Sequence, residues 1–527
     1  MENEEKIAAL EAENAALKST VAELSALNKW YEEQFRLAKH RQYGVSSEKT
    51  PSSTEQLSLF NEAEITADKK AAEPEYEQVA AHKRKKREGK RDELYEGIPT
   101  EQVVHELPEN ERICPNCGGD LHARGHEVLR RELTIIPAQV RAIEHVQTVY
   151  SCRECEKRAV DESVPMVKAS VPAPVIQGSG IASPSLLAYI LCNKYVLALP
   201  LNRQEQEFER LGISLSRQTM ANWIIFVANH RLKPLYELLK AEMIQNDILH
   251  ADDTTVQVIK DGRAANTQSY MWLYRTAERA EKPIVLFEYQ PTHSSSHPLR
   301  FLTGYSGYLQ ADGYQGYHKL EFQGVTIVEC WSHARRKFHD ALKALDKADQ
   351  PNAPANIGYE YCNRLFALEK QYDEQNLTPE RRFEERLRES KPIAKEFFGW
   401  VMEASRSDYF LRLPKSAFGH AITYALNQRE WLMNVYLDGR LSISNNLAER
   451  SIRPFTIGRN NWLFAFSPKG AQASAIAYSI VETAKANNLV PMLYLQFLFE
   501  QLPNLPPERF CECFPWVDAV QSFCLVR

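Results

Sequence analysis

The stretch ILHADDTTVQVI at residues 248–259 decides the fold. It is rich in Val, Ile and Thr, which favour a β-strand, and it carries Asp252 and Asp253 side by side. Two further strand-like runs follow at 269–274 and 283–288, joined by short polar or glycine-containing connections. Because neighbouring side chains of a strand point to opposite faces of the sheet, only one of the two carboxylates is expected to face a common site.

Beyond these three strands, the pattern alternates between helices and strands. A helical segment near Leu299 precedes a strand at 308–312, and a further strand at 325–331 leads into another helix. A three-strand meander followed by alternating helices and strands predicts a ribonuclease H-like α/β fold. In that fold, Asp252 lies in the first strand and Asp312 ends the fourth.

A third acid, Glu449, lies in the stretch SNNLAERSIRPF, where Ser444 is expected to cap a helix that runs to Pro454. Three carboxylates that converge from two strands and a helix bind hard cations through oxygen. Two Mg²⁺ (or Mn²⁺) ions about 4 Å apart would activate the attacking oxygen and stabilise the leaving oxygen in phosphoryl transfer. Asp252, Asp312 and Glu449 are therefore candidate catalytic, metal-binding residues, and the alternative for each acid alone is a surface charge or a helix cap.

Basic side chains near these acids are candidates for contacts with DNA phosphates. They are His333, Arg335 and Arg336 on the helix after Trp331, together with Arg453 and Arg459 beyond the third acid. The alternative is a basic face that is only exposed to solvent.

Four of the ten cysteines form two tight pairs, Cys114 with Cys117 and Cys152 with Cys155. Two such turns supply the four thiolates of a tetrahedral zinc site, which is structural because no coordination position stays open for a substrate. Residues 132–150, between the pairs, are rich in Val, Ile and Thr and are consistent with a β-ribbon. Two chance Cys-x-x-Cys pairs are the alternative.

The first segment has the pattern of a coiled coil. Alternating steps of three and four residues keep one apolar stripe facing a partner helix, and the pattern favours a dimer over a single amphipathic helix packed on its own chain. The stripe is formed at one heptad position by Ile7, Asn14, Val21 and Asn28, and at the other by Leu10, Leu17, Leu24 and Tyr31.

A charged linker follows, with few large apolar side chains, and is expected to be mostly disordered. Its basic run is a candidate DNA contact, with a solvated linker as the alternative. The run includes Lys83, Arg84, Lys85, Lys86 and Arg87.

Residues 201–223 have the pattern of a helix, a glycine turn and a second helix. Gly212 permits the turn, and Ser216 is a plausible N-cap. This resembles a helix-turn-helix whose second helix would enter a DNA groove, although an ordinary helical hairpin fits as well. The candidate DNA-binding side chains of the second helix are Arg217, Gln218 and Asn222.

The composition of the 527-residue chain is that of a globular protein, with 44% hydrophobic and 25% charged residues. The net charge of −5 excludes a uniformly basic surface but not local basic patches. No apolar run of about 18 residues and no secretory signal are present, so we expect a cytoplasmic, nucleoid-associated protein without a membrane partner.

The chain as a whole resembles the transposases of the IS66 family of bacterial insertion sequences, from about residue 41 to 502. The resemblance rests on the two Cys-x-x-Cys pairs and on the following stretches: QYGVSSEK at 42–49, PLNRQEQEFERLGISLSRQTMANW at 200–223, HADDTT at 250–255, QADGYQGY at 310–317, CWSHARRKF at 330–338, SNNLAERSIRPFTIGRNNWLF at 444–464 and GAQASAIAYSIVETAKANN at 470–488.

The resemblance implies a DDE transposase in which Asp252, Asp312 and Glu449 are the acidic triad. Water would first cleave a strand at the transposon end, and the freed 3′-hydroxyl would then attack target DNA. Two departures stand out. The family usually has Asp-Glu-Thr-Pro where this chain has Asp-Asp-Thr-Thr, which leaves Asp253 as a competing ligand, and Asn460 replaces the usual lysine.

The implied partners are transposon and target DNA, a second copy of the chain or a larger synaptic oligomer, and two small accessory proteins encoded by the same element. A non-catalytic DNA-binding regulator derived from a transposase and a nuclease without joining activity are the alternatives.

The expected segments are a coiled coil at 1–46, a disordered basic linker at 47–95, a zinc-binding domain at 96–170, a helical DNA-binding region at 171–245, a catalytic core at 246–345 and 441–468 with a helical insertion at 346–440, and a helical tail at 469–527.

Overall fold

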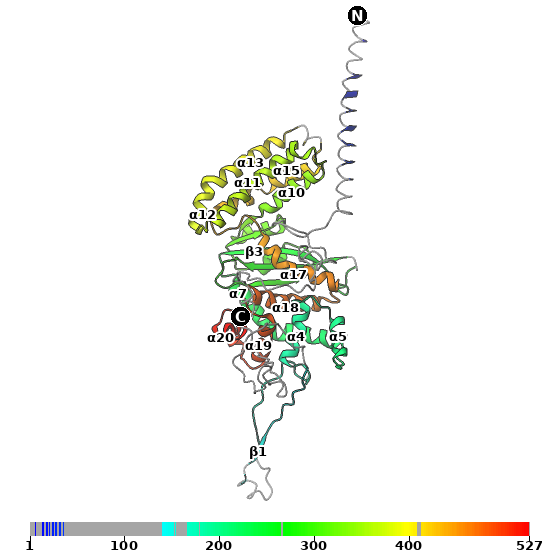
Figure 1. Ribbon diagram of the computed structural model, residues 1–527, viewed down its shortest axis with the longest axis vertical. Helices are drawn as coiled ribbons and strands as arrows, with labels where there is room; N and C mark the ends of the chain where they lie inside the picture. Colours follow the sequence, from blue (N-terminus) through cyan, green and yellow to red (C-terminus); the bar gives the residue numbers. More distant parts are fainter. Residues whose placement is uncertain are drawn as a thin grey trace, which may run out of the picture. The chain divides into compact units, whose positions relative to one another are not determined.

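The computed structural model describes scattered positions between 6 and 35, and residues 140–151, 153, 166–178, 180–264, 267–407, 410 and 413–525. Two compact units are formed, one from residues 1–46 and 169–526 and the other from residues 47–168 with residue 527. The sheet and most of the helices belong to the first unit (Figure 1).

In the smaller unit, a two-stranded antiparallel ribbon is formed by β1 (Val149–Ser151) and β2 (Met166–Lys168). The prediction of a ribbon over 132–150 is therefore wrong for residues 140–148, which form no strand. All six residues of the ribbon are exposed, so there is no buried face to extend the pairing. The predicted zinc ligands Cys114, Cys117, Cys152 and Cys155, and the basic residues 83–87, lie outside the described residues.

In the larger unit, a five-stranded mixed sheet has the order β5-β4-β3-β6-β7. The first three strands pair antiparallel, and β6 and β7 continue the sheet in parallel with β3. All five strands that the sequence predicts are present. Their bounds are β3 (Ile248–Gln257), β4 (Gln268–Thr276), β5 (Val285–Gln290), β6 (Tyr308–Ala311) and β7 (Thr326–Glu329).

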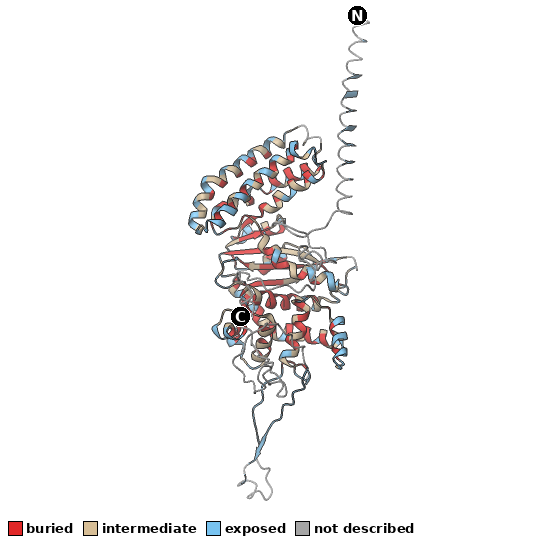
Figure 2. Cartoon of the chain, viewed as in Figure 1, coloured by how far each residue is buried: buried red, intermediate tan, exposed pale blue. Residues whose placement is uncertain are grey.

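The sheet is covered on both faces, because consecutive residues of its strands are buried. Residues 271–274 in β4 are all buried, which an exposed face would not allow (Figure 2). Short helices connect the strands, namely α8 (Ser296–Phe301) between β5 and β6 and α9 (Gln315–His318) between β6 and β7.

Helix α18 covers the outer edge of the sheet along β5. The hydroxyl of Ser479 accepts from the backbone N–H of Phe287 at 2.7 Å, and the hydroxyl of Thr483 accepts from the N–H of Val285 at 3.0 Å and donates to its carbonyl at 2.9 Å. These polar side chains stand four residues apart on one face of the helix. They supply the hydrogen bonds that a neighbouring strand would otherwise give.

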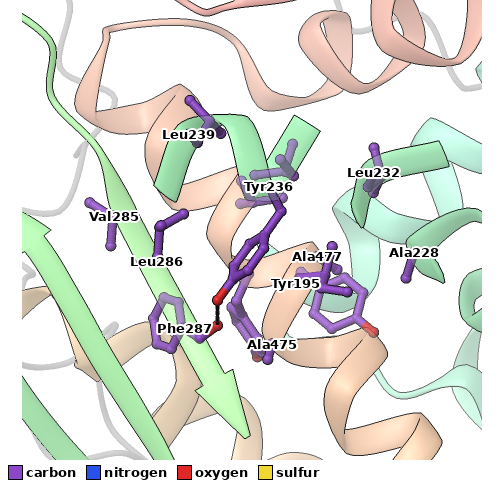
Figure 3. Packing of buried hydrophobic residues seen from close by; sticks show 14 of the residues in the cluster. Tyr195, Ala228, Leu232, Tyr236, Leu239, Val285, Leu286, Phe287, Ala475 and Ala477 are labelled. Carbon is purple, nitrogen blue, oxygen red and sulfur yellow. Dashed lines mark hydrogen bonds between the residues drawn. The ribbon is translucent and has the colours of Figure 1, made fainter. Parts of the chain in front are cut away.

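A second helix, α7 (Lys233–Met243), also contacts β5, and it packs against α18. The hydroxyl of Tyr236 donates to the carbonyl of Phe287 at 3.1 Å, and Leu239 and Ala475 lie in the same apolar cluster (Figure 3). The helices of this layer are α4 (Pro184–Tyr195), α5 (Leu201–Arg210), α6 (Arg217–Val227), α7 (Lys233–Met243), α18 (Pro468–Ala486), α19 (Pro491–Gln501) and α20 (Asp518–Cys524).

Helices α5 and α6 and the turn between them are present as the sequence predicts, an arrangement that both a helix-turn-helix and an ordinary helical hairpin would have. Gly212 has a φ of 79° at the turn, a conformation that favours glycine. The hydroxyl of Ser216 accepts from the N–H of Thr219 at 3.2 Å, so it caps α6.

A group of helices with its own apolar core lies between β7 and the return of the chain to the sheet (Figure 1). The buried guanidinium of Arg386 donates to both carboxylate oxygens of Glu369, at 2.6 and 2.7 Å, and to the carbonyl of Leu441 at 2.8 Å. The helices are α10 (Trp331–Lys343), α11 (Pro354–Glu374), α12 (Pro379–Glu385), α13 (Lys391–Ala404), α15 (Ala417–Asn427) and α16 (Arg429–Met433). The chain then returns through α17 (Asn446–Trp462).

The described positions between 6 and 35 are helical, and their apolar side chains, such as Leu17 and Leu24, are exposed. The coiled-coil dimer stays a prediction, since the structure contains a single chain. Among the helices of the described ranges, none has both the length and the apolar composition needed to cross a bilayer.

Replacing Thr483 with valine should lower the free energy of unfolding by about 1–3 kcal/mol, because the N–H and the carbonyl of Val285 would both lose a buried partner. Urea denaturation measures the change. Thr303→Val is the matched control, since Thr303 is exposed and bonds only within its own turn. Equal stability losses in the two variants would contradict the role assigned to α18.

Candidate active site

Two acidic residues lie at neighbouring positions of the sheet. Asp252 is in the middle of β3, and Asp312 directly follows β6, the parallel neighbour of β3. Each carboxylate accepts a backbone hydrogen bond, Asp252 from the N–H of Asp253 at 2.9 Å and Asp312 from the N–H of Tyr314 at 3.2 Å. Both side chains are half-buried. The charge of Asp312 acts on Asp252, so the two carboxylates lie close to one another.

The third acid, Glu449, reaches this site from the first turn of α17, which packs along β3. The charges of Asp312 and Glu449 both act on Asp252, so the three carboxylates share one electrostatic environment. Glu449 lies 3.7 Å from Nε2 of His333 and 3.8 Å from the guanidinium of Arg336. The structure thus brings together the three acids that the sequence singles out.

Two details of α17 differ from the sequence-based expectation. The helix begins at Asn446, with Asn445 rather than Ser444 at the N-cap, and it continues through Pro454 to Trp462. Residues 452 and 455 on either side of the proline are buried against the core. Tertiary packing of this face therefore outweighs the loss of one helical hydrogen bond.

Asn445 holds this helix in place by its side chain. The amide Nδ2 donates to the carbonyl of Ala251 at 2.7 Å, which orients Oδ1 toward Nδ1 of His250 at 3.0 Å. Since Oδ1 is only an acceptor, Nδ1 of His250 carries the proton and donates. The backbone N–H of Asn445 in turn donates to the sulfur of Cys330 at 3.1 Å. Asn445 thereby joins β3, the end of β7 and the start of α17.

A second amide reinforces this junction. Gln310 in β6 donates through Nε2 to the carbonyl of Ser442 at 2.6 Å and accepts through Oε1 from its N–H at 2.9 Å. Because Gln310 and Asn445 are both buried, these bonds are shielded from water. Hydrogen bonds to β3, to β6 and to Cys330 directly after β7 therefore hold the segment that leads into α17.

Burial and the neighbouring acids raise the pKa of Asp252 well above its ordinary value, with the charge of Asp312 as the largest electrostatic cause. Burial lowers the pKa of His250 to about 4, so this histidine is neutral at pH 7. Burial also opposes a charge on His333, but the negative charges of Cys330, Glu449 and Asp312 raise its pKa to about 9. The site thus pairs crowded carboxylates with a cationic histidine.

The adjacent acid, Asp253, has different partners. Its carboxylate lies 2.9 Å from Nε2 of His293, whose ring stacks on Tyr314 at 3.9 Å and on Tyr270 at 4.3 Å. The expected opposite orientation of the two neighbouring side chains is therefore present. Asp252 faces the helix that carries Glu449, and Asp253 faces an aromatic cluster.

The candidate basic residues fall into two groups. Arg336 is exposed beside Glu449, whereas Arg335 points at α11, with Nε donating to Asn363 at 2.7 Å and Nη2 to Tyr359 at 3.2 Å. Arg459 donates to the hydroxyl of Thr254 at 2.9 Å and so links α17 to β3.

Arg453 is half-buried on the same helix, and Arg217, Gln218 and Asn222 are exposed on α6, away from this cluster of acids in the sequence and in the fold. DNA binding by each of these side chains stays a prediction.

Sequence reasoning missed the polar groups around the acids. Glu329 at the end of β7 is fully buried and lies 2.8 Å from Nε2 of His318, whose ring stacks on Trp431 at 3.6 Å. Burial raises the pKa of Glu329 to about 7, while His318 opposes the rise. The pairing of β6 with β7 sets Glu329 beside Ala311 and thus next to Asp312. Only strand register, which one sequence does not reveal, identifies this acid.

The donor set of Asp252, Asp312 and Glu449 consists of carboxylate oxygens, the ligands that Mg²⁺ and Mn²⁺ prefer. Oε1 of Glu449 is buried without a hydrogen-bond partner among the described residues. Together with the repulsion that raises the pKa of Asp252, this atom fits a site that a divalent cation would neutralise. Cys330 and His333 also bring donor atoms within 4.8 Å of Glu449.

Replacing Asn445 with alanine should lower the free energy of unfolding by about 2–4 kcal/mol, because His250 and the carbonyl of Ala251 would both lose a buried partner. Thermal or urea denaturation measures the loss. Asn446→Ala, one residue further along and half-buried, is the control and should cost well under half as much. A similar loss of stability in both variants would contradict the role assigned to Asn445 in holding the start of α17 against β3.

Comparison with known proteins gives a consistent result over most of the chain. The model described as "Transposase IS66 family" matches residues 179–473, and the "IS66 C-terminal element" matches residues 479–516. The "zinc-finger binding domain of transposase IS66" matches residues 111–156, and "Transposase C of IS166 homeodomain" matches residues 30–103.

Two relatives come from Sinorhizobium fredii and are named as uncharacterized proteins. The protein y4hP is 30% identical over 440 residues, which cover 80% of this chain and 75% of that protein. The protein y4qI is 28% identical over 533 residues, which cover 97% of this chain and 94% of that protein. Because the family model covers more than half of the sequence and includes all three acids, the chain belongs to the IS66 family of transposases.

Proposed function

We propose that the chain is a DDE transposase that cleaves DNA at transposon ends and joins the freed ends to target DNA. The observation that carries this proposal is the convergence of Asp252, Asp312 and Glu449 on one partly enclosed site. Membership of a transposase family supports DNA as the substrate. Two phosphoryl transfers are proposed at this site: hydrolysis at the transposon end, then attack of the freed 3′-hydroxyl on target DNA.

We further propose that the catalytic domain is ribonuclease H-like. The sheet supports this assignment, since three antiparallel strands are extended by two parallel strands in the order β5-β4-β3-β6-β7. Asp252 lies on β3, Asp312 directly follows the adjacent parallel strand β6, and Glu449 is on the helix that returns to the sheet. Helices 346–440 are then an insertion between the second and third acids.

The side chains around the acids suggest how DNA is held. Mg²⁺ or Mn²⁺ bound by the carboxylates would activate the attacking oxygen and neutralise charge on the leaving oxygen. Arg336 and His333 flank Glu449 at 3.8 and 3.7 Å. The exposed guanidinium of Arg336 is placed to contact a phosphate, and His333 adds positive charge beside the acids. Asn445 and Gln310 act indirectly, by holding the helix of Glu449 against the strands of the two aspartates.

Recognition of the ends is proposed for segments outside this site. The exposed face of α6 with Arg217, Gln218 and Asn222 would enter a DNA groove, and the zinc-binding segment and the basic run at 83–87 would add contacts to the backbone. The helical N-terminal segment, with its exposed apolar side chains, would pair two copies as a coiled coil. Accessory proteins encoded by the same element are proposed as further partners. The proposed location is the cytoplasm, in association with the nucleoid.

Asp252→Asn and Glu449→Gln should each abolish cleavage and strand transfer, because each removes a charged oxygen that the cation site needs. Asp253→Asn should retain activity, since Asp253 is bonded to His293. The measurement is Mg²⁺-dependent cleavage and joining of labelled duplexes that carry the ends of the element. All three variants should bind these duplexes like the wild type.

Other outcomes of this assay discriminate between the alternatives. Loss of activity in Asp253→Asn but not in Asp252→Asn would move the triad to the second aspartate. Binding without any cleavage by the wild type, with the accessory proteins added, would support a DNA-binding regulator. Cleavage without joining would indicate a nuclease.

Cys114→Ser should release zinc and weaken end binding, because three remaining thiolates hold the ion less tightly and the segment depends on it for folding. Metal analysis of the purified protein and binding to labelled ends measure both effects. Cys511→Ser removes an exposed cysteine and should keep a full complement of zinc. Full zinc retention in Cys114→Ser would rule out a site built from all four thiolates.

A further inference from the structure

A strip of three large apolar side chains follows α17 and is exposed. The exposed fractions are 65% for Leu463, 43% for Phe464 and 59% for Phe466. Scattered single apolar residues are ordinary on a surface, but these three stand within four positions of the chain. This strip lies at the far end of the helix that carries Glu449 in its first turn.

The backbone of the strip is held in an unfavourable conformation. Leu463 has a φ of 64° and a ψ of −46°, and the N–H of Phe464 donates to the carbonyl of Trp462 at 2.8 Å across this turn. A positive φ at a residue with a branched side chain persists only where the surroundings enforce it, and such residues are concentrated at functional sites.

Two anchors on either side enforce this turn. Before it, the ring of Trp462 packs edge-on against buried Phe455 at 5.4 Å, and the amide of Asn461 donates to the carbonyl of Ala198 at 3.1 Å. After it, the chain pairs with the end of β3. The N–H of Ala465 donates to the carbonyl of Gln257 at 2.9 Å, and the N–H of Ile259 donates to the carbonyl of Ala465 at 3.0 Å.

This pairing holds the backbone between the two aromatic rings. Ala465 forms an isolated parallel bridge with Val258, and it stands between the two exposed phenylalanines Phe464 and Phe466. The N–H of Lys260 donates to the carbonyl of Phe466 at 2.9 Å, and its ammonium group lies 4.6 Å from the centre of the Phe466 ring. The rings are thus rigidly presented beside a cation.

Two elements connect the strip to the acids: helix α17, which carries Glu449, and strand β3, which carries Asp252. Ala465 pairs with Val258, six residues along the chain from Asp252, which corresponds to about 20 Å at the rise of a strand. A DNA strand advances by about 3.4 Å per nucleotide, so the separation corresponds to about six nucleotides. Arg453, Arg459 and Lys469 lie on α17 or directly after the strip and add positive charge on this side.

We propose that Leu463, Phe464 and Phe466 form a binding site for unpaired nucleobases of DNA, within about six nucleotides of the phosphate at the acids. Exposed aromatic rings next to basic groups are the usual platform for unstacked bases, which present a flat apolar face beside a charged backbone. Opening a base pair costs free energy, and the rigid strip compensates by stacking on the released base. The inference rests on the proposed function, since it requires DNA to lie along the acids.

The test compares a fully paired end duplex with a set of end duplexes that differ from it only in pairing. Each member of the set has one two-base mismatch, at one of the six positions on either side of the cleavage site. The affinity of the full-length protein is measured by fluorescence anisotropy in Ca²⁺. We expect the wild type to bind one of the mismatched duplexes about 5- to 150-fold more tightly than the paired duplex.

Three variants separate stacking from folding. Phe464→Ala should lose most of the preference for the mismatch while keeping its affinity for the paired duplex. Leu463→Gly relieves the positive φ, so it should melt at the same or a higher temperature and still bind the mismatch more weakly. Phe523→Ala removes a ring on α20 that is half exposed like those of the strip, and it should keep the full preference.

Failure of this inference is distinguishable from failure of the proposed function. A wild type that cleaves and joins ends but shows no preference for any mismatch overturns the base-binding site and leaves the enzyme intact. A preference that survives Phe464→Ala, with a change in oligomeric state by sedimentation, assigns the strip to contact between protein chains instead. A wild type that binds ends and never cleaves them removes the proposed function, and with it the stated position of the strip.

Discussion

The arrangement of the three acids Asp252, Asp312 and Glu449 depends on one buried amide, that of Asn445. Its two polar atoms bond to His250 and Ala251 in β3, and its backbone N–H bonds to the sulfur of Cys330 at the end of β7. Because the amide is out of contact with water, any shift of the helix would leave several polar groups without partners. The position of Glu449 relative to Asp252 is therefore set by hydrogen bonds to the backbone, and the acids themselves are not required to hold the helix in place.

The acids carry an electrostatic cost that this framework has to support. Asp252 has a raised pKa because it is buried and close to Asp312 and Glu449, and Glu329 is a further buried acid on the neighbouring strand. Like charges that lie close together repel each other, so the proximity of the carboxylates costs free energy. A framework of neutral amides and apolar contacts tolerates this repulsion, and a divalent cation would relieve it.

Much of the sheet was predictable from the sequence, because the strands 248–257 and 285–290 contain several β-branched or aromatic residues. Their order across the sheet and the role of Glu329 were not, since both depend on register between distant segments. The prediction of Ser444 as the N-cap of α17 was wrong, because capping preferences depend only on neighbouring residues. They do not reveal that Asn445 has partners in β3, 194 and 195 residues away. Pro454 was expected to end a helix whose far half is held by packing on the core.

The edge of the sheet has a consequence for how the chain is made. β5 is synthesised almost two hundred residues before α18, whose hydroxyls complete its hydrogen bonding. A nascent chain therefore leaves the ribosome with an open strand edge that persists until α18 (Pro468–Ala486) has been synthesised. An mRNA cut short between the codons for Glu449 and those for α18 yields a polypeptide with all three acids and an exposed strand edge, which aggregation or proteolysis removes before it can act on DNA.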